Sequence, residues 1–308
     1  MKALAKRIPA LLKRAVRSWT RSDKCQAQAW VTGSRRLDIC AAQFAHVLSL
    51  AGRPSLEAKR CLELGAGWVL SAALVCHLLG ARKVVATDIA PHAHPEALPY
   101  ALKMAVPSIV RDLLSLFADN ARVRQRYERL LPIQKFSFET LQELGIEYVS
   151  PFDFARQKMA AAFDFIYSFS ALEHVPREEV QPLLANLADA LAPGGGMIHY
   201  IHLEDHAAFA RRPVDFLRIP PEQYARALQT ERGNRIRMRE WLARFGEIPG
   251  TSCELLFSHR RTDCPLPADV DRSIAFADER DLRTSHLGIC LRKPVSGQAP
   301  ECSCAGGE

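Results

Sequence analysis

The chain has 308 residues, of which 48% are hydrophobic and 24% are charged, so it can build a sizeable core and is not of the disordered class. No apolar run reaches roughly 18 residues, which argues against a membrane-spanning helix. The formal net charge is +7, and much of the excess lies at the N-terminus.

Residues 1–25 are expected to form a basic amphipathic arm. Residues 1–24 hold eight Lys or Arg and one acid, and their apolar residues recur at helical spacing. Such a helix either docks on an anionic membrane surface or packs its apolar stripe on the domain that follows. The basic residues interrupt any secretory signal, so we expect a cytoplasmic protein, with membrane association through this arm as an option. Beyond the arm the charges balance, and no nucleic-acid partner is expected.

Strand and helix signals alternate from residue 59 onward. The expected strands are 60–64, 83–87, 146–149, 163–168, 197–201, 254–257 and 286–291. The expected helices are 68–79, 107–117, 120–131, 137–144, 178–191, 221–229 and 238–245, with a Pro-Gly-Gly-Gly turn at 193–196. Repeated β-α-β units predict a Rossmann-like α/β fold, a mostly parallel seven-stranded sheet with helices on both faces. A helical insertion of about residues 95–144 follows the second strand.

The expected domain spans residues 26–292, and residues 293–308 are expected to be a disordered tail. Nine cysteines, an odd number without a CxxC pair, are expected to be reduced thiols. Cys302 and Cys304 lie in the Gly-rich tail.

Two features indicate a site for an adenosine-containing cofactor. Gly65 and Gly67 follow the first strand, where the absence of a Cβ lets a ligand approach the backbone. Asp88 ends the second strand, 21 residues beyond Gly67, where a carboxylate can accept hydrogen bonds from ribose hydroxyls. Both features also suit an NAD-dependent oxidoreductase. Against NAD, Leu70 stands where the dinucleotide fingerprint requires its third glycine, and the carboxylate of Glu63 would repel a pyrophosphate.

Four segments, in the right order, resemble the motifs of class I S-adenosylmethionine-dependent methyltransferases. They are CLELGAG at 61–67, VVATD at 84–88, FDFIYSFSALEHV at 163–175, and 187–196 with its LAPGGG. The resemblance spans about residues 58–205, although the family's third glycine is Val69 here. It implies S-adenosylmethionine as cofactor, with Asp153 at the position of an acid that commonly contacts adenine. The implied cofactor-binding residues are Glu63, Gly65, Ala66, Gly67, Asp88, Ile89, Phe152, Asp153, Ser168 and Ser170.

A narrower likeness concerns the acceptor. Gly67-Trp68 before an apolar helix, the helical insertion, and HLEDH at 202–206 ahead of FLR at 216–218 resemble bacterial methyltransferases encoded with glycan or other secondary pathways. The resemblance therefore implies a small-molecule or glycan-type acceptor.

Methyl transfer to oxygen is helped by a general base beyond strands four and five. Asp205 and His206 form an adjacent acid and imidazole after the fifth strand, and His174 follows the fourth. These three are the catalytic candidates, although Asp205 could instead cap the next helix and His174 could be a family residue without a catalytic task. No metal site is expected, because His199, His202 and His206 lack a Cys or Asp cluster at metal-ligand spacing.

Arginines follow the fifth strand in quick succession, at 211, 212, 218, 235, 237 and 239. They would suit an acidic acceptor or form a solvated basic face. The insertion at 95–144 would form a lid or wall over the acceptor, or an oligomer surface. Two alternatives to methyl transfer stay open: an NAD-dependent oxidoreductase, and a non-catalytic scaffold that docks through its N-terminal arm.

Overall fold

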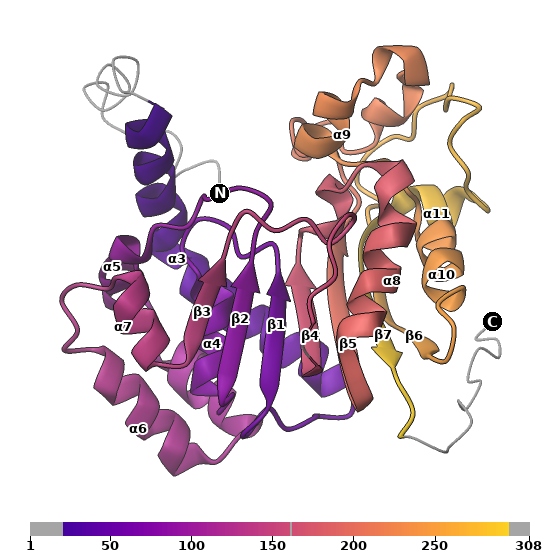
Figure 1. The fold of residues 1–308 in the computed structure, drawn as a ribbon. Helices are drawn as coiled ribbons and strands as arrows, with labels where there is room; N and C mark the ends of the chain where they lie inside the picture. Colours follow the sequence, from indigo (N-terminus) through magenta and orange to yellow (C-terminus); the bar gives the residue numbers. More distant parts are fainter. Residues whose placement is uncertain (1–20, 161, 296–308) are drawn as a thin grey trace.

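The computed structural model describes residues 21–160 and 162–295, and its centre is a seven-stranded sheet (Figure 1). The strands are β1 (Arg60–Leu64), β2 (Lys83–Thr87), β3 (Ile146–Val149), β4 (Phe163–Phe169), β5 (Leu191–His202), β6 (Ser252–Arg260) and β7 (Thr284–Arg292). They lie in the order β3-β2-β1-β4-β5-β7-β6, and β7 alone runs in the direction opposite to the other six strands. The predicted Rossmann-like, mostly parallel seven-stranded sheet is confirmed.

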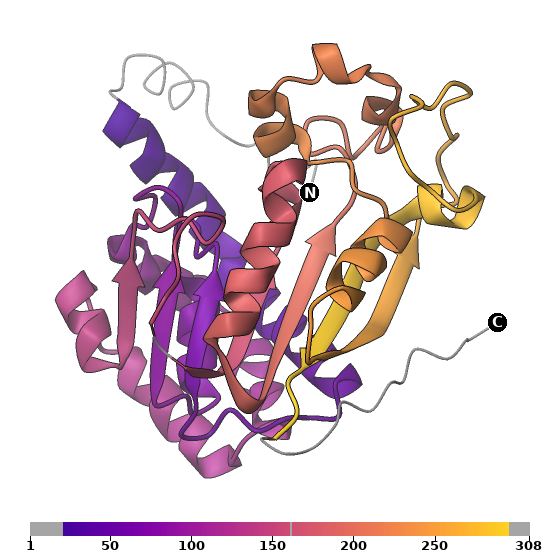
Figure 2. The same ribbon diagram turned by 45° about the vertical axis from the view of Figure 1, so that its right-hand side comes forward.

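Helices cover both faces of this sheet (Figure 2). The helices are α3 (Arg21–Leu50), α4 (Ser71–Leu78), α5 (Leu98–Met104), α6 (Asn120–Leu130), α7 (Phe138–Glu143), α8 (Val180–Ala190), α9 (Arg226–Arg232), α10 (Met238–Gly246) and α11 (Glu279–Arg283). Side chains alternate along a strand, so Tyr167 of β4 packs on the α3 and α4 side while Ile166 packs on the α8 and α10 side. The central strands are buried on both faces, which is why apolar residues occupy successive positions in them, as at 165–167 of β4.

The 30-residue helix α3 forms much of one layer and was not predicted over its full length. Its second half buries Leu37, Ala41, Phe44 and Leu48, a helical spacing, against the sheet. The helix passes residue 25 without a break, so the division between an arm at 1–25 and a domain at 26–292 stays a prediction. Residues 1–20, which carry most of the expected amphipathic arm, lie outside the described residues.

The insertion between β2 and β3 is helical, as expected. Besides α5, α6 and α7 it contains the short helices η1 (Pro95–Ala97), η2 (Ser108–Asp112) and η3 (Leu114–Leu116), so the single helix expected at 107–117 is divided in two. Val110, Leu114 and Val123 join the same core as α3 and α4. The insertion therefore thickens one layer of the domain.

Strand β5 begins earlier than expected. The helix expected at 178–191 ends at Ala190, and the expected turn at 193–196 belongs to the start of β5, where the register with β4 shifts between Phe163 and Phe165. Gly194 donates its backbone N–H to Lys293 O at 3.0 Å, which places this stretch beside the segment after β7.

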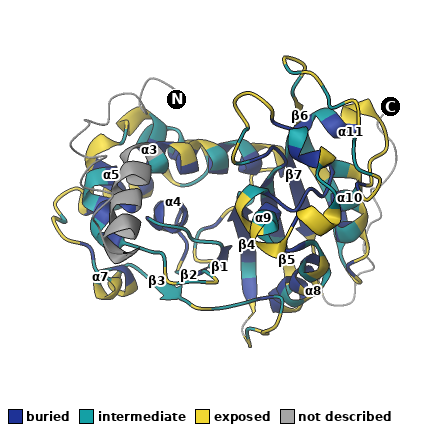
Figure 3. Ribbon diagram, turned by 90° about the horizontal axis from the view of Figure 1, so that it is seen from above, coloured by how far each residue is buried: buried dark blue, intermediate teal, exposed yellow. Residues whose placement is uncertain are grey.

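Beyond β5 the chain builds a cap over the carboxyl ends of the strands, formed by residues 203–235 and 261–283. It has its own small core of Val214, Phe216, Leu217, Tyr224, Ile274 and Leu282. Seen from above, α9 lies over the ends of β4 and β5, with the buried strands beneath (Figure 3). The cap thus stands at the edge of the sheet where parallel α/β folds bind ligands.

No helix in the described part of the chain combines the length and apolarity that crossing a membrane requires. Among the cysteines whose side chains are described, Cys40, Cys61, Cys76, Cys264 and Cys290 are free thiols, and all of these except Cys264 are buried. The expected disordered tail, with Cys302 and Cys304, lies outside the described residues beyond position 295.

Candidate active site

A cavity of about 1060 Å³ opens at the carboxyl edge of the sheet, between the loops that follow β1, β2 and β4 and the cap. Nine of the ten sequence-predicted cofactor residues line it. They are Glu63, Gly65, Ala66, Gly67, Asp88, Ile89, Phe152, Asp153 and Ser170. Ligand sites in proteins commonly range from about 300 to 1,000 Å³, so this cavity has room for a cofactor together with an acceptor.

The glycine loop after β1 is fixed by backbone hydrogen bonds. Gly65 and Ala66 both donate their N–H groups to Thr87 O at 2.9 Å. Gly65 has φ +76°, and a Cβ there would lie 2.6 Å from Ala171 Cβ. Gly67 has φ +65°, and a Cβ there would meet no atom within 4 Å. A side chain at position 65 would therefore clash with Ala171, whereas Gly67 leaves open space that a ligand can occupy.

Asp88 holds the same loop from the end of β2. Its Oδ2 accepts a hydrogen bond from Gly67 N at 2.9 Å, and the neighbouring Ile89 is 62% exposed. Phe152 donates its N–H to Asp88 O at 2.9 Å, which joins the loops after β2 and β3. The carboxylate of Asp88 thus stands where three cavity-lining segments meet.

Asp153 lies farther along the same wall, and its side chain is already engaged. Its Oδ1 accepts from Ala155 N at 2.9 Å, and its Oδ2 accepts from Arg156. A ligand amino group would therefore have to share this carboxylate with a guanidinium.

Glu63 is a buried carboxyl at the floor of the cavity, 4% exposed. Burial raises the pKa of Glu63 to about 8, and the Tyr167 hydroxyl, which donates to Glu63 Oε2 at 3.3 Å, opposes this rise. A positively charged ligand group beside Glu63 would favour its ionised form.

Ser168, the tenth residue predicted to bind the cofactor, is not among the described residues that line the cavity, and its role stays a prediction. Its side chain is fully buried and its Oγ lies 2.8 Å from His199 Nδ1, because strand alternation turns it toward the α8 and α10 layer. Ser170, just past the strand end, does line the cavity and adopts φ +53°, a conformation rare for residues with a side chain.

His174 lines the cavity from the short helix η4 (Leu172–His174) after β4. Its Nδ1 lies 2.6 Å from Thr230 O in α9. A carbonyl oxygen only accepts, so Nδ1 carries the proton and Nε2 keeps a free lone pair. Burial lowers the pKa of His174, and the nearby His202 lowers it further, so the imidazole is neutral at neutral pH.

The side chains of Asp205 and His206, expected as an acid–imidazole pair, have separate partners in the structure. The Asp205 side chain is fully buried and binds Arg232, whose Nε donates to Oδ1 at 3.0 Å. The same Oδ1 accepts from Ala207 N at 3.0 Å, so Asp205 stabilises the local backbone, although the segment that follows is a turn rather than the helix that Asp205 was expected to cap in the alternative. His206 instead has its Nε2 3.7 Å from Glu173 Oε1, and burial lowers the pKa of His206 to about 3. Neither residue is among the described residues that line the cavity.

The arginines after β5 do not form an anion-binding cluster. Arg237 is fully buried and donates to the backbone oxygens of Leu203 and Leu282, and Arg235 stacks 3.9 Å above the Tyr224 ring. Arg212 and Arg218 pair with acids, Asp215 and Asp269 respectively. These positions therefore hold the cap together or lie at its surface, and they give the expectation of an acidic acceptor no support.

Other parts of the lining were not predicted. Arg36 and Cys40 come from α3, Trp68 follows the glycine loop, and Arg226 and Thr230 come from α9. The apolar spacing within residues 37–48 is a signal that could have revealed α3, but no local signal in the sequence indicates that α9 lies beside the cavity.

None of the described lining residues belongs to the insertion at 95–144, so the interpretation of this insertion as a lid over the acceptor has no support here.

The residues present fit an adenosine-containing cofactor with a positive charge. Open space at Gly67 admits a ligand against the backbone, Asp88 provides acceptor oxygens beside it, and the buried Glu63 provides a carboxyl. The position that the dinucleotide fingerprint gives to its third glycine is filled by Leu70, fully buried at φ +57°.

Comparison with known proteins agrees with this geometry. A family model described as "Methyltransferase domain" matches residues 35–251. No curated protein matches the sequence.

Several solved structures are similar at low sequence identity. An S-adenosylmethionine-dependent methyltransferase from Mesorhizobium loti is 20% identical, with 81% of this chain and 98% of that one covered and a TM-score of 0.44. The YcgJ protein from Bacillus subtilis is 14% identical, with 82% and 99% covered and a TM-score of 0.44. Magnesium protoporphyrin IX methyltransferase from Synechocystis, solved with bound S-adenosylmethionine, is 12% identical, with 84% and 81% covered and a TM-score of 0.40. These values are too low to carry an argument, and the assignment rests on the family model.

The matched segment covers more than half of the chain and includes the whole glycine loop, Asp88 and His174. The chain therefore belongs to the methyltransferase-domain family and is an S-adenosylmethionine-dependent methyltransferase.

Proposed function

We propose that this enzyme methylates a hydroxyl oxygen of a small-molecule or glycan-type acceptor. The observation that carries the proposal is the hydrogen bond from His174 Nδ1 to Thr230 O, at a position that lines the cavity. It leaves Nε2 as the nitrogen that can take a proton. A hydroxyl must lose its proton during methylation, so it gains most from such a base.

We assign cofactor binding to the cavity residues around the glycine loop. When bound, S-adenosylmethionine supplies a methyl group already activated by a sulfonium. Asp88 would accept hydrogen bonds from ribose hydroxyls, and Glu63 would face the positive charge. The remaining residues of the proposed set are Gly65, Ala66, Gly67, Ile89, Phe152, Asp153 and Ser170.

His174 would act on the acceptor in two ways. Its Nε2 would accept the hydroxyl hydrogen bond and so orient the oxygen, and it would hold the proton after transfer. The bond to Thr230 fixes the ring in one tautomer, as a second partner commonly does for a catalytic imidazole.

The acceptor side of the cavity is polar, which suits a hydroxylated acceptor. Arg226, Thr230 and Glu231 line it from the cap. Arg226 forms an ion pair with Glu179 at 2.6 Å, so this side of the cavity carries a positive and a negative side chain rather than a positive patch. This pairing favours a neutral polyhydroxylated acceptor over an anionic one.

The proposal is tested by incubating the enzyme with methyl-labelled S-adenosylmethionine and fractionated host extract. We expect label in hydroxylated small molecules or glycans, and much less with His174→Gln. Label in lipid-linked glycan would also support membrane docking by residues 1–24. Label confined to protein or RNA would contradict the proposed acceptor class.

A further inference from the structure

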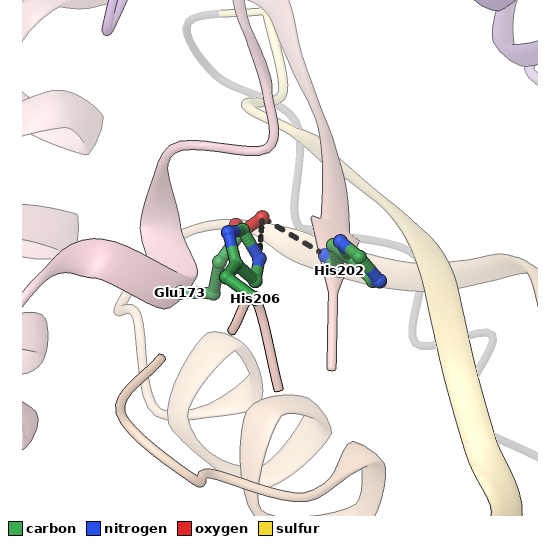
Figure 4. A group of neighbouring side chains, drawn as sticks. All are labelled: Glu173, His202 and His206. Atoms are coloured by element: carbon green, nitrogen blue, oxygen red, sulfur yellow. Dashed lines mark hydrogen bonds and ion pairs between the residues drawn. The ribbon is translucent and has the colours of Figure 1, made fainter. Parts of the chain in front are cut away.

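We propose that Glu173, His202 and His206 bind a divalent cation of the zinc type beside the cavity. Glu173 comes from η4 after β4, His202 ends β5, and His206 lies in the first turn of the cap (Figure 4). One potential ligand atom of each lies within 4.8 Å of the others. Two imidazoles and a carboxylate are a ligand set that zinc uses in proteins, with a fourth position left for water.

Two of the three side chains hold buried polar atoms without a partner. Glu173 is 1% exposed, and its Oε2 forms no hydrogen bond within the described residues. The same holds for Nε2 of His206, which lies 3.7 Å from the other carboxylate oxygen of Glu173. Buried acceptor and donor groups are nearly always satisfied in native proteins, so two unsatisfied atoms on neighbouring side chains indicate a missing ligand.

The third side chain, His202, is oriented as metal-bound histidines are. Its Nε2 lies 2.8 Å from Glu204 Oε2, and a carboxylate accepts, so Nε2 carries the proton and Nδ1 keeps a lone pair. Glu204 is in turn held by Arg261, whose NH1 donates to Oε1 at 2.7 Å. A carboxylate on the far nitrogen of a ligating imidazole fixes its tautomer and raises its basicity as a ligand.

Ideal tetrahedral coordination would bring the ligand atoms to about 3.3 Å from one another. Small side-chain rotations from separations within 4.8 Å would achieve this. The sequence did not reveal this site, because His202 and His206 lie close together after β5 whereas Glu173 lies on another segment and meets them only when β4 and β5 pair.

A second group in the same place is a weaker candidate. His202, Glu204 and His286 also lie within 4.8 Å of one another. There, however, Glu204 is already bound by both His202 and Arg261, and His286 stacks on His202 with ring centroids 4.2 Å apart. Both carboxylate oxygens of Glu204, the acid of this group, are therefore satisfied without a cation.

The site would lie next to the cavity. The His206 ring is 4.4 Å, centroid to centroid, from that of His174, which lines the cavity. A cation with an open coordination position there would attract an oxygen-rich acceptor. Metal binding is measured without turnover, so its failure and the failure of the proposed acceptor are distinguishable.

The test begins with untagged, full-length protein stripped by a chelator and titrated with Zn²⁺ against a chromophoric competitor. A Cys302→Ser/Cys304→Ser background removes the thiols of the tail as alternative ligands. We expect one equivalent bound more tightly than about 1 µM, visible absorption bands of tetrahedral Co²⁺, and a Zn²⁺-dependent rise in Tm.

Variants then locate the site. Glu173→Gln and His206→Gln should each weaken Zn²⁺ binding at least about 100-fold, and Glu204→Gln about 10- to 100-fold. The matched control His286→Gln, which alters a neighbour of His202, should change affinity less than about threefold. Circular dichroism verifies that each variant folds. The proposal is overturned if the parent protein binds no zinc, if all variants bind like the parent, or if only His286→Gln loses binding.

Discussion

Replacing Glu63 with glutamine removes a buried ionisable group from the cavity floor with almost no change in shape. Burial raises the pKa of Glu63 to about 8 in the folded protein, whereas its ordinary value is 4.5. Between those pH values the folded protein keeps a proton that the unfolded chain has released. The unfolded state then binds fewer protons, so the contribution of Glu63 to stability falls as the pH rises.

The magnitude follows from the two pKa values. Each pH unit within this window lowers the free energy of unfolding by about 1.4 kcal/mol. Ionisation of Glu63 in the unfolded chain therefore destabilises the fold by about 3 kcal/mol at pH 7 and by less than about 1 kcal/mol at pH 5. Glutamine lacks this effect and keeps an oxygen that can accept from the Tyr167 hydroxyl. We expect Glu63→Gln to be more stable than the parent by about 3 kcal/mol at pH 7.

Urea unfolding of both proteins at pH 5, 6, 7 and 8 measures this difference. Every other titrating group is present in both, so subtraction isolates Glu63. The stability gain should grow with pH, while the affinity for S-adenosylmethionine should fall, since the variant cannot become negative beside the cofactor. A difference that is constant with pH would refute the reasoning.

Two further predictions concern His174 and the glycine loop. His174→Gln should lower kcat by about 10²- to 10⁴-fold with little change in cofactor affinity; an unchanged kcat would contradict its role as base. Gly65→Ala should destabilise the fold by about 2–4 kcal/mol, because its Cβ would lie 2.6 Å from Ala171 Cβ at a positive φ. Gly67→Ala places its Cβ in open space, so it should lower the free energy of unfolding by only about 1 kcal/mol, measured by urea unfolding, yet weaken the binding of the cofactor. Equal losses of stability in the two variants would contradict the loop geometry.

The sheet could be predicted because its signals are local. Strands β1, β2 and β3 have the predicted bounds, since buried apolar runs end at a glycine, an acid or a proline-bearing turn. Helix α3 was missed because its residues mix charges with apolar groups, and only its packing under the sheet makes it a layer. The early start of β5 was missed because the glycines at 194–196 are typical of a turn, and their pairing with β4 and with the segment after β7 is a tertiary effect.

The residues of the site likewise divide into those whose position follows from the local sequence and those placed by tertiary contacts. The glycine loop and Asp88 follow strands directly, so their position is fixed by the strand ends. The position of Ser168 away from the cavity could have been predicted from strand alternation, since Ser168 shares a face with Ile166 rather than with Phe169. The pairing of Asp205 could not be predicted, because its partner Arg232 is 27 residues away in the cap.

The central claim is that the cavity between Gly67 and Asp88 binds S-adenosylmethionine. Calorimetric titration of the parent and of Asp88→Asn with S-adenosylmethionine and with NADH tests it most directly. Asparagine keeps an oxygen for Gly67 N and removes only the second acceptor. We predict one S-adenosylmethionine per chain, at least about tenfold weaker binding in the variant, and no binding of NADH. Tight NADH binding without S-adenosylmethionine binding, or equal affinities in parent and variant, would contradict the account.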